Sequence, residues 1–497
     1  MAEMFELSEQ LREKVGHALK EAIELGSDLQ PEADQRAAGK ALRKEVPRTS
    51  HATWQPAPHR PDPVELLRSQ EASRVQLLLP IRHERMATSA FAFYRGSALI
   101  MASDLSGTPS TGIEVQACGD AHISNFGLYL SPERRTVFDI NDFDETCRGP
   151  WEWDIKRLAA SVEICGRDRG FEPETRKAAV LASVRAYRTA MESYSHMGEM
   201  DVRYAHIDVD TILEMLSEQG IADKVEAKDV KKATKAINKS KAKDNTRAIA
   251  KLTEVVDGQM RIVSAPPLVV PLRDMAARVG QADHVDENTT RAFVAIVLNE
   301  YLRSLSPERR QLVERYQGID IAHKVVGVGS VGTRALIVVL QGALDGDNLV
   351  LQVKEAQESV LERFCGKSAA EQHGQRVVEG QRAMQATSDI LLGWCRLPDS
   401  KGGVNDFYVR QLWDGKGSMD LTHITARHLE LYAASCGRTL ARAHARTGNR
   451  FAIAGYLGSS DTFDQAIARF AVAYADQNEA DYQRFMDAFA SGELEGK

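Results

Sequence analysis

The alternation of apolar and polar residues divides the chain into helix-rich and strand-rich regions. In the first half, "WDIKRLAASVEICG" and "ETRKAAVLASVRAYRTAMESY" place apolar residues three and four positions apart, which predicts packed amphipathic helices. "GIEVQACGDAHISNFGLYL" and "RTVFDINDFDE" each contain a short apolar strand that leads into polar residues. We therefore expect two loops, each carried by a strand, that lie against helices.

After residue 319 the pattern changes to β-branched runs. "KVVGVGSVGTRALIVVLQG" and "NLVLQVKEA" are joined by glycine-containing turns, as in an antiparallel sheet. "EQHGQRVVEGQRAMQAT" returns to helix, and "VNDFYVRQLWDGKGS" adds a strand. The remaining sequence, which includes "GRTLARAHAR", is helical by the same test.

These changes of pattern predict five segments. Residues 1–63 form an extension with a proline-rich linker, 64–216 a helical segment with the two loops, 217–318 a lysine-rich helical connection, 319–415 the strand-rich unit, and 416–497 a closing helical segment. In the connection, six lysines recur at nearly helical spacing: Lys224, Lys228, Lys231, Lys235, Lys239 and Lys243. They predict a solvated helix face, with a docking surface for an anionic partner as the alternative.

Composition and charge favour small-molecule partners. The chain has 497 residues, 43% of them hydrophobic, and its formal net charge of -7 argues against nucleic acid as a partner. No apolar stretch reaches membrane-spanning length, and the first residues do not resemble a signal peptide. The cysteines lie far apart, without metal-ligand spacing. We expect a cytoplasmic protein with no membrane partner, and the sequence leaves its oligomeric state open.

Two acidic stretches in the first half carry oxygen ligands suited to a divalent cation. "CGDAHISNFG" contains Asp120 and Asn125, and "FDINDFDE" contains Asp139, Asp142 and Asp144. Crowded carboxylates repel one another unless a cation or basic side chains compensate them, and hard cations prefer carboxylate and amide oxygens. A bound metal explains both stretches together. For any single residue, a turn cap or a solvated strand end is the alternative.

A glycine-rich turn and a lysine follow in the strand-rich unit. "GVGSVGTR" contains Gly327, Gly329, Ser330 and Gly332, and glycines let backbone amides approach phosphate oxygens closely. Lys354 lies in the next apolar run, where a buried ammonium needs an anion. A plain hairpin turn and a lysine that reaches water are the alternatives. A dinucleotide-binding turn would lead into a helix, whereas "RALIVVLQG" is strand-like.

The order of strand, glycine loop, strand, lysine and helix is that of the small lobe of protein kinases. "GDAHISN" resembles the GDxHxxN catalytic loop of aminoglycoside and choline phosphotransferases, and "NDFDETCRGPWEWDIKRLA" is similar to their metal-binding segment. Through "RMATSAFAFYRG", "GVGSVGTR" and "RVVEGQRAMQA", most of the chain also resembles the bacterial family named domain of unknown function 2252.

The kinase resemblance implies a bilobal α+β fold with a small antiparallel-sheet lobe and a large helical lobe. In kinases the glycine loop and lysine precede the catalytic loop, whereas here Lys354 follows Asp120. The resemblance therefore implies a circularly permuted protein-kinase-like fold, which is physically acceptable because the termini of a compact domain often lie close together. "GRTLARAHAR" would then be the helix that ordinarily leads into the catalytic loop.

The resemblance also assigns roles to the acidic residues. Asp120 matches the catalytic aspartate, which accepts or orients the proton of an acceptor hydroxyl. Asn125 and Asp142 match ligands of Mg2+, and Asp144 is the second carboxylate expected to contribute. Asp154 matches the aspartate that braces the catalytic loop.

In the strand-rich unit, the resemblance implies an ATP site. The glycine loop and Lys354 would bind the nucleotide phosphates, and Lys354 would pair with Glu379, with Glu371 as the alternative. "FYVRQLWDGKGS" would form the hinge strand beneath the adenine.

Some residues depart from the phosphotransferase pattern or lie outside it. Cys118 stands where those enzymes have a histidine and is expected to be a small buried side chain, and His122 is expected to fix the loop. Arg82, Arg85 and Arg95 lie in "RHERMATSAFAFYRGS", among aromatic residues. They would either bind phosphate or an acidic substrate, or pair with the aspartates of the first cluster.

Taken together, the sequence predicts an ATP- and magnesium-dependent phosphotransferase that acts on a hydroxyl of a small molecule. A nucleotidyl transferase on the same fold and a non-catalytic ATP-binding sensor are alternatives. A metallophosphoesterase is a third, because "GDAH" contains the Asp-x-His that often opens a two-metal site, although the later GNH element is missing.

Overall fold

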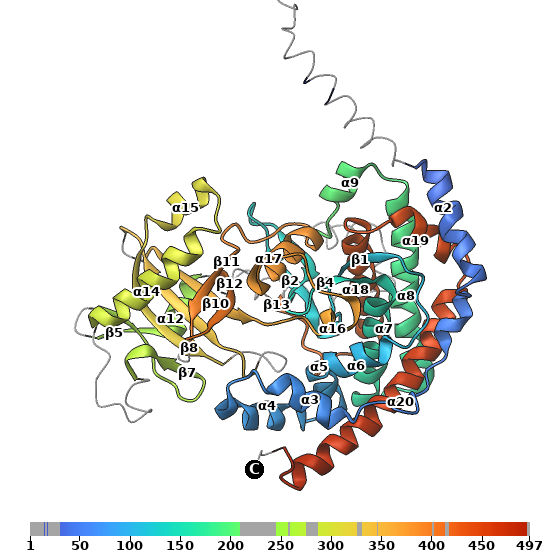
Figure 1. Cartoon of the computed structure of the whole chain (residues 1–497), viewed down its shortest axis with the longest axis horizontal. Coiled ribbons are helices and arrows are strands. Elements are labelled where there is room, and N and C mark those ends of the chain that lie inside the picture. The colour runs from blue at the N-terminus through green and yellow to red at the C-terminus, as the bar shows by residue number, and fades with distance from the viewer. Residues whose placement is uncertain are drawn as a thin grey trace, which may run out of the picture.

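The computed structural model describes residues 14, 17, 30–208, 245–256, 259–274, 287–325, 331–344, 346–399, 402–412 and 417–494. Within these residues, one larger antiparallel sheet with its own helices lies at one end of the molecule, and long helices form the other (Figure 1). The mixed α+β class expected from the sequence is confirmed. The predicted lysine-rich helix face, Lys224 to Lys243, lies outside the described residues.

The larger sheet has six described strands in the order β11-β12-β10-β9-β8-β7. They are β7 (Val269–Pro271), β8 (Gln317–Lys324), β9 (Ala335–Gln341), β10 (Asn348–Ala356), β11 (Gly393–Pro398) and β12 (Val404–Gln411). All neighbouring pairs are antiparallel, and in β10 Lys354 lies opposite Ala335 of β9 and Tyr408 of β12.

Helices cover both faces of this sheet. Leu351 and Val353 of β10 pack with Val297 of α14 (Glu287–Leu302), while Val350 packs on the opposite face with Leu252 of α12 (Asn245–Leu252). Because successive side chains of a strand point to opposite faces, burial on both sides explains why β10 is a continuous apolar run. α17 (His373–Met384) packs near β11 and β12, and α15 (Pro307–Val313) follows α14.

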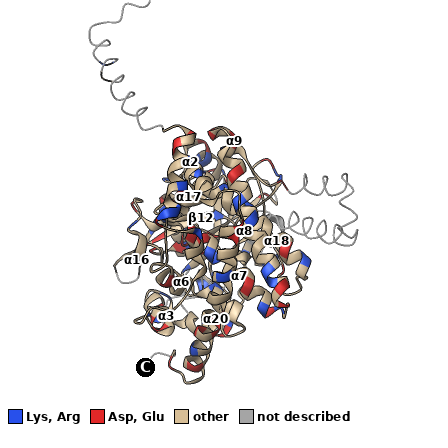
Figure 2. Cartoon of the chain, turned by 90° about the vertical axis from the view of Figure 1, so that its right-hand side faces the viewer, with Lys and Arg blue, Asp and Glu red and all other residues tan. Residues whose placement is uncertain are grey.

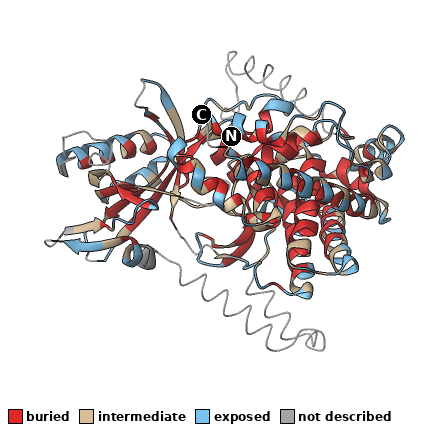
Figure 3. Ribbon diagram, turned by 90° about the horizontal axis from the view of Figure 1, so that it is seen from below, coloured by how far each residue is buried: buried red, intermediate tan, exposed pale blue. Residues whose placement is uncertain are grey.

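The helical end is built from both halves of the chain. Its long helices are α7 (Trp151–Asp168), α8 (Pro173–Ser195), α18 (Ala426–Ala445), α19 (Arg450–Leu457) and α20 (Thr462–Ala490). α18 packs closely on α8 because Gly437 has no side chain: a Cβ there would lie 2.0 Å from the carbonyl oxygen of Ser183. Figure 3 shows buried residues both in this helical end and in the sheet.

Short helices from the N-terminal part wrap around this body. They are α2 (Glu32–Ala41), α3 (Pro63–Glu71), α4 (Leu79–Met86), α5 (Ala90–Gly96) and α6 (Ala98–Leu105), with 3-10 turns at Leu42–Lys44, Arg48–Ala52 and Gln76–Leu78. The blue α2 lies beside the red α19 in Figure 1. In the proline-rich stretch, Arg60 pairs with Asp104 at 2.7 Å and with Asp481 at 2.6 Å, so this stretch is tied to the helical body.

Three small sheets complete the described structure, and two of them hold the acidic loops. β1 (Glu114–Ala117) pairs with β4 (Cys147–Pro150), and β2 (Phe126–Leu130) lies between β3 (Thr136–Ile140) and β13 (Gly417–Ser418). The remaining elements are β5 (Thr253–Val256) paired with β6 (Gln259–Ile262), the 3-10 turn Ile123–Asn125, α9 (Glu199–Tyr204) and α16 (Glu362–Cys365). The first acidic loop connects β1 to β2 and the second connects β3 to β4, so both loops run between the same two small sheets.

Charged residues of both signs are interspersed over the helices that Figure 2 presents. No helix in the described part of the chain has the length and apolar character needed to cross a membrane.

Candidate functional site

Lys354 and the second acidic loop meet although they belong to different halves of the chain. The Nζ of Lys354 lies 3.4 Å from Oδ2 of Asp142 and also donates to Asp144. Only 3% of the lysine side chain is exposed, against 40% for Asp142. Burial alone would lower the pKa of Lys354, but the charges of Asp142 and Asp144 outweigh it and raise this pKa. The lysine is therefore a buried, charged ammonium.

The second loop is held from the sheet side. The Tyr408 hydroxyl donates to Asp144 at 2.9 Å, and Lys354 lies over the Tyr408 ring. Arg376 of α17 donates to the carbonyl oxygens of Asp144 (2.8 Å) and Thr146 (2.6 Å). Because Arg376 is buried and fixes the backbone, it positions the carboxylate next to the lysine.

The 3-10 turn of the first loop orients Asn125 toward the second. Its amide nitrogen donates to the carbonyl oxygens of Asp120 at 3.1 Å and Asp142 at 3.0 Å. These bonds leave the amide oxygen as the atom of Asn125 available to a cation. Mg2+ usually takes one or two protein oxygen ligands and completes its shell with water and phosphate oxygens, so Asn125 and Asp142 fit such an ion.

Asp120 is bound by an arginine. Nε and Nη2 of Arg157 donate to Oδ1 of Asp120 at 2.9 and 2.7 Å, and Nη2 also donates to the carbonyl of Tyr94. Burial opposes the charge of Arg157, but Tyr94 and Asp120 outweigh it and raise the pKa of the guanidinium. His122 lies 3.6 Å from Oδ2 of Asp120, and burial lowers its pKa to about 4, so it is neutral at pH 7.

Asp154, in the first turn of α7, braces the first loop. Its carboxylate accepts from the backbone N–H groups of Cys118 (2.6 Å) and Gly119 (2.9 Å). Gly119 has a φ of 77°, and a Cβ there would lie 2.2 Å from the carbonyl oxygen of Glu145, so only glycine fits. Nε2 of His444 in α18 lies 3.1 Å from the same carboxylate.

Asp139 is neither a metal ligand nor a solvated acid, the two roles considered for it from the sequence. It is fully buried, forms an ion pair with Arg442 and accepts from the backbone N–H of Ala386 at 2.9 Å. A carboxylate that is fully committed to an arginine and a backbone N–H is structural. Cys118 is buried as expected, and burial followed by the charge of Asp154 raises the pKa of its thiol well above the usual value.

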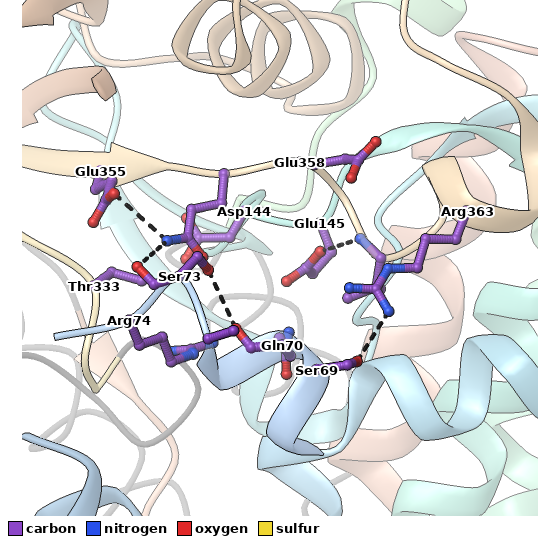
Figure 4. A pocket seen from close by; sticks show the side chains of 13 residues that line it. Ser69, Gln70, Ser73, Arg74, Asp144, Glu145, Thr333, Glu355, Glu358 and Arg363 are labelled. Carbon is purple, nitrogen blue, oxygen red and sulfur yellow. Dashed lines mark hydrogen bonds between the residues drawn. The ribbon is translucent and has the colours of Figure 1, made fainter. Parts of the chain in front are cut away.

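A small cavity of about 290 Å³ opens beside Asp144 (Figure 4). Figure 4 shows Asp144, Glu145 and Glu355 around it, with Arg74 below. Burial raises the pKa of Glu145 to about 7, although the backbone N–H of Val360 donates to it. Arg74 and Arg363 belong to the same lining, so the cavity carries charges of both signs.

Part of the expected nucleotide site can be located. Gly327, Gly329 and Ser330 lie outside the described residues. Gly332 lies at the start of the described segment that leads into β9, where its carbonyl accepts from the backbone N–H of Val75 at 2.7 Å.

The lysine–glutamate pair expected from the resemblance is absent from the described contacts of Lys354. Glu379 lies on the exposed side of α17 and accepts from Gln375 at 2.8 Å, and Glu371 is also exposed. Val377 and Val378 direct the buried face of α17 away from Glu379. The counter-ions of Lys354 are therefore Asp142 and Asp144.

The family named domain of unknown function 2252 and described as an uncharacterised protein conserved in bacteria matches residues 74–488. The chain belongs to this family. The family relationship expected from the sequence is thereby confirmed, and the match spans both acidic loops, Lys354 and α18. No curated protein and no solved structure matches the chain.

In this DUF2252 protein, the three arginines near the first loop have different roles. Arg82 is buried and pairs with Glu71 at 3.1 Å. Arg85 lies in the last turn of α4, and Arg95 lies in the last turn of α5, where it lines a second pocket.

The described residues contain no group of three or more His, Cys, Asp or Glu side chains placed to hold a metal ion. An ion held by Asn125 and Asp142 together with phosphate oxygens needs no such group.

Sequence reasoning missed three residues that hold the DUF2252 site together: Arg157, His444 and Arg376. Arg157 lies one turn after Asp154 on the same face of α7, and this i, i+3 spacing could have indicated that both residues face the first loop. His444 and Arg376 act across long sequence separations, which periodicity does not report.

Proposed function

We propose that this protein is an ATP- and magnesium-dependent phosphotransferase that acts on a hydroxyl of a small molecule. One observation carries the proposal: the buried ammonium of Lys354 contacts the carboxylates of Asp142 and Asp144. A lysine next to phosphate groups and a carboxylate that holds their cation are what phosphoryl transfer requires at one place, because its catalysis is largely positioning and charge stabilisation.

The order of elements supports a protein-kinase-like arrangement, circularly permuted. In the sheet, β8, the segment that contains Gly332, β9, the lysine strand β10 and α17 follow one another as in the small lobe of that fold. α18, from the C-terminal part, supplies His444 to the Asp154 carboxylate that holds the first loop. Through the Asp154 carboxylate, this contact connects the helix expected to lead into the catalytic loop with that loop.

Each residue then has a defined task. Asn125 and Asp142 would hold Mg2+, which supplies charge neutralisation at the phosphates when it is bound. Lys354 binds phosphate oxygens, and Asp120 orients the acceptor hydroxyl and takes its proton. In the reaction the acceptor oxygen forms a bond to the γ-phosphorus, the bond from that phosphorus to the β–γ bridging oxygen breaks, and ADP leaves.

The pairing of Asp120 with Arg157 affects this role. The guanidinium occupies Oδ1, so Oδ2 is the oxygen left for an acceptor hydroxyl. A carboxylate fixed by two hydrogen bonds to one oxygen has few orientations available, which favours positioning of the acceptor.

The test is transfer of label from ATP to metabolites of a bacterial extract by the full chain. Label from the γ-position in an organic product, lost in Asp120→Asn, is the expected result. Label from the α-position would instead identify a nucleotidyl transferase. ATP binding without any transfer, unchanged by Asp120→Asn, would identify a non-catalytic sensor and contradict the proposal.

A further inference from the structure

A second pocket lies next to the first acidic loop, on the side of α5. Its volume is about 640 Å³, which is within the range of small-molecule sites. Arg95 and Phe91 of α5 line it, together with Ser124 of the 3-10 turn and residues 419–422. Ser124 lies directly before Asn125 in the loop that carries Asp120, so the pocket adjoins the proposed catalytic residues.

Arg95 has no counter-ion of its own in this pocket. Among the residues that the structure describes, its side chain forms no hydrogen bond and no ion pair, and its Nε is buried without a partner. Burial lowers the pKa of Arg95, and the charge of Asp120 raises it in part. A guanidinium that is partly removed from water without a hydrogen-bonding anion is costly.

The neighbouring carboxylates are already engaged. Asp120 is bound through two nitrogens of Arg157, and Asp168 pairs with Arg169 at 2.5 Å. Asp420 is exposed and accepts from the backbone N–H of Thr422 at 2.9 Å. The positive charge of Arg95 is therefore left for a ligand.

We propose that this pocket binds the acceptor substrate, and that the acceptor is a small hydroxyl-bearing acid whose carboxylate or phosphate group binds Arg95. The planar guanidinium suits either group, because both offer two oxygens to its fork of N–H donors. Phe91 provides an apolar wall for the carbon skeleton, and the Ser124 hydroxyl is a further polar group in the lining. The role of the bound acid as acceptor rests on the proposed function, but the anion site itself does not.

The test compares four small alcohols of different charge on the full chain without nucleotide: glycerol 3-phosphate, glycerate, glycerol and choline. Calorimetry should detect saturable binding of at least one of the two anions, and of neither glycerol nor choline. Arg95→Gln should weaken that binding at least about ten-fold, and Arg95→Lys, which keeps the charge without the fork, by a smaller factor. Arg303→Gln removes a charge from an arginine that is 73% exposed and outside the pocket lining, and should change the affinity less than about two-fold.

Equal binding of the anion to wild type and Arg95→Gln would overturn the inference, as would binding of neither anion. Should the substituted chains not fold, phenylglyoxal labelling of the wild type decides the matter, because the bound anion must protect Arg95 from modification. Magnesium–ATP binding is measured in parallel. Its absence alongside an Arg95-dependent anion site would reject the proposed function alone, and its presence without anion binding would reject only this inference.

Discussion

The ammonium of Lys354 lies 3.4 Å from the carboxylate of Asp142, although 212 residues separate them in the chain. Lys354 belongs to a strand of the large sheet and Asp142 to a loop carried by a small one. The contact therefore joins the sheet-bearing end to the helical end at one charged site.

Asp139 and Asp142 stand close in sequence, yet substitution of Asp139 should mainly lower the stability of the fold, and substitution of Asp142 should mainly weaken magnesium–ATP binding. Asp139→Asn leaves the buried Arg442 without its charged partner and should lower the free energy of unfolding by about 3 kcal/mol. Asp142→Asn should change it by less than about 1 kcal/mol, because Asp142 is 40% exposed and Asp144 still pairs with Lys354.

Urea unfolding measures these two effects. Magnesium–ATP binding should show the reverse order, with loss only in Asp142→Asn. A metal-binding defect in a folded Asp139→Asn chain would show that Asp139 was wrongly assigned.

Asp154 should be important for stability. Asp154→Ala leaves two backbone N–H groups and His444 without their acceptor and should lower the free energy of unfolding by about 3 kcal/mol. Asp476→Ala is the control, because this aspartate is 68% exposed in its pair with Arg167, and its loss should cost less than about 1 kcal/mol. Equal costs in urea unfolding would refute the bracing role.

Arg157 should affect turnover more than nucleotide affinity, because it positions Asp120 and not the nucleotide. Arg157→Lys loses the two-nitrogen contact and should reduce label transfer about ten-fold or more, with the Kd of ATP within about two-fold of wild type. Arg167→Lys, at the far end of the same helix, should leave both quantities unchanged. A parallel loss of ATP affinity in Arg157→Lys would point to general damage of the site.

His51 should make the fold sensitive to acid. It is fully buried beside the Tyr456 hydroxyl, and burial, followed by the charge of Lys156, lowers its pKa to about 3. An unfolded histidine binds a proton near its ordinary pKa of 6.5. Between these two pH values the unfolded chain binds more protons than the folded chain. The contribution of His51 to the free energy of unfolding is therefore fully present above pH 6.5 and decreases as the pH falls.

His51→Gln isolates this effect from that of the other histidines. Between about pH 5.5 and 4.5, the wild type should lose about 1.4 kcal/mol of unfolding free energy more than the variant. Parallel pH profiles of the two proteins in urea unfolding would mean that His51 is protonated in the folded state.

Local patterns predicted much of the fold. The helices around residues 151–195, the apolar strand with Lys354 and the mixed α+β class all follow from periodicity, because each element buries a face of its own. The apolar spacing in α17 also predicts that Glu379 is exposed, because Val377, Val378 and Met384 define a buried face that does not include it. The resemblance to kinases implied a glutamate partner for Lys354, whereas Glu379 accepts from Gln375 and Lys354 pairs with Asp142 and Asp144.

Only part of the candidate site could be predicted from the sequence. The bracing role of Asp154 and the meeting of Lys354 with Asp142 were implied by resemblance, and the distances now describe them. The contacts of Arg157 and His444 arise from helix packing across the molecule. Periodicity identifies which residues are buried, but not which buried charges meet.

The proposed function requires that Lys354 and Asp142 together form a magnesium–ATP site. Calorimetric titration of ATP, with and without Mg2+, into wild type, Lys354→Ala and Asp142→Ala tests it directly, with Glu379→Ala as an exposed control. We expect magnesium-dependent binding by the wild type and Glu379→Ala, and binding that is at least about ten-fold weaker in each of the other two variants. Failure of the wild type to bind ATP, or equal binding by all four proteins, would contradict it.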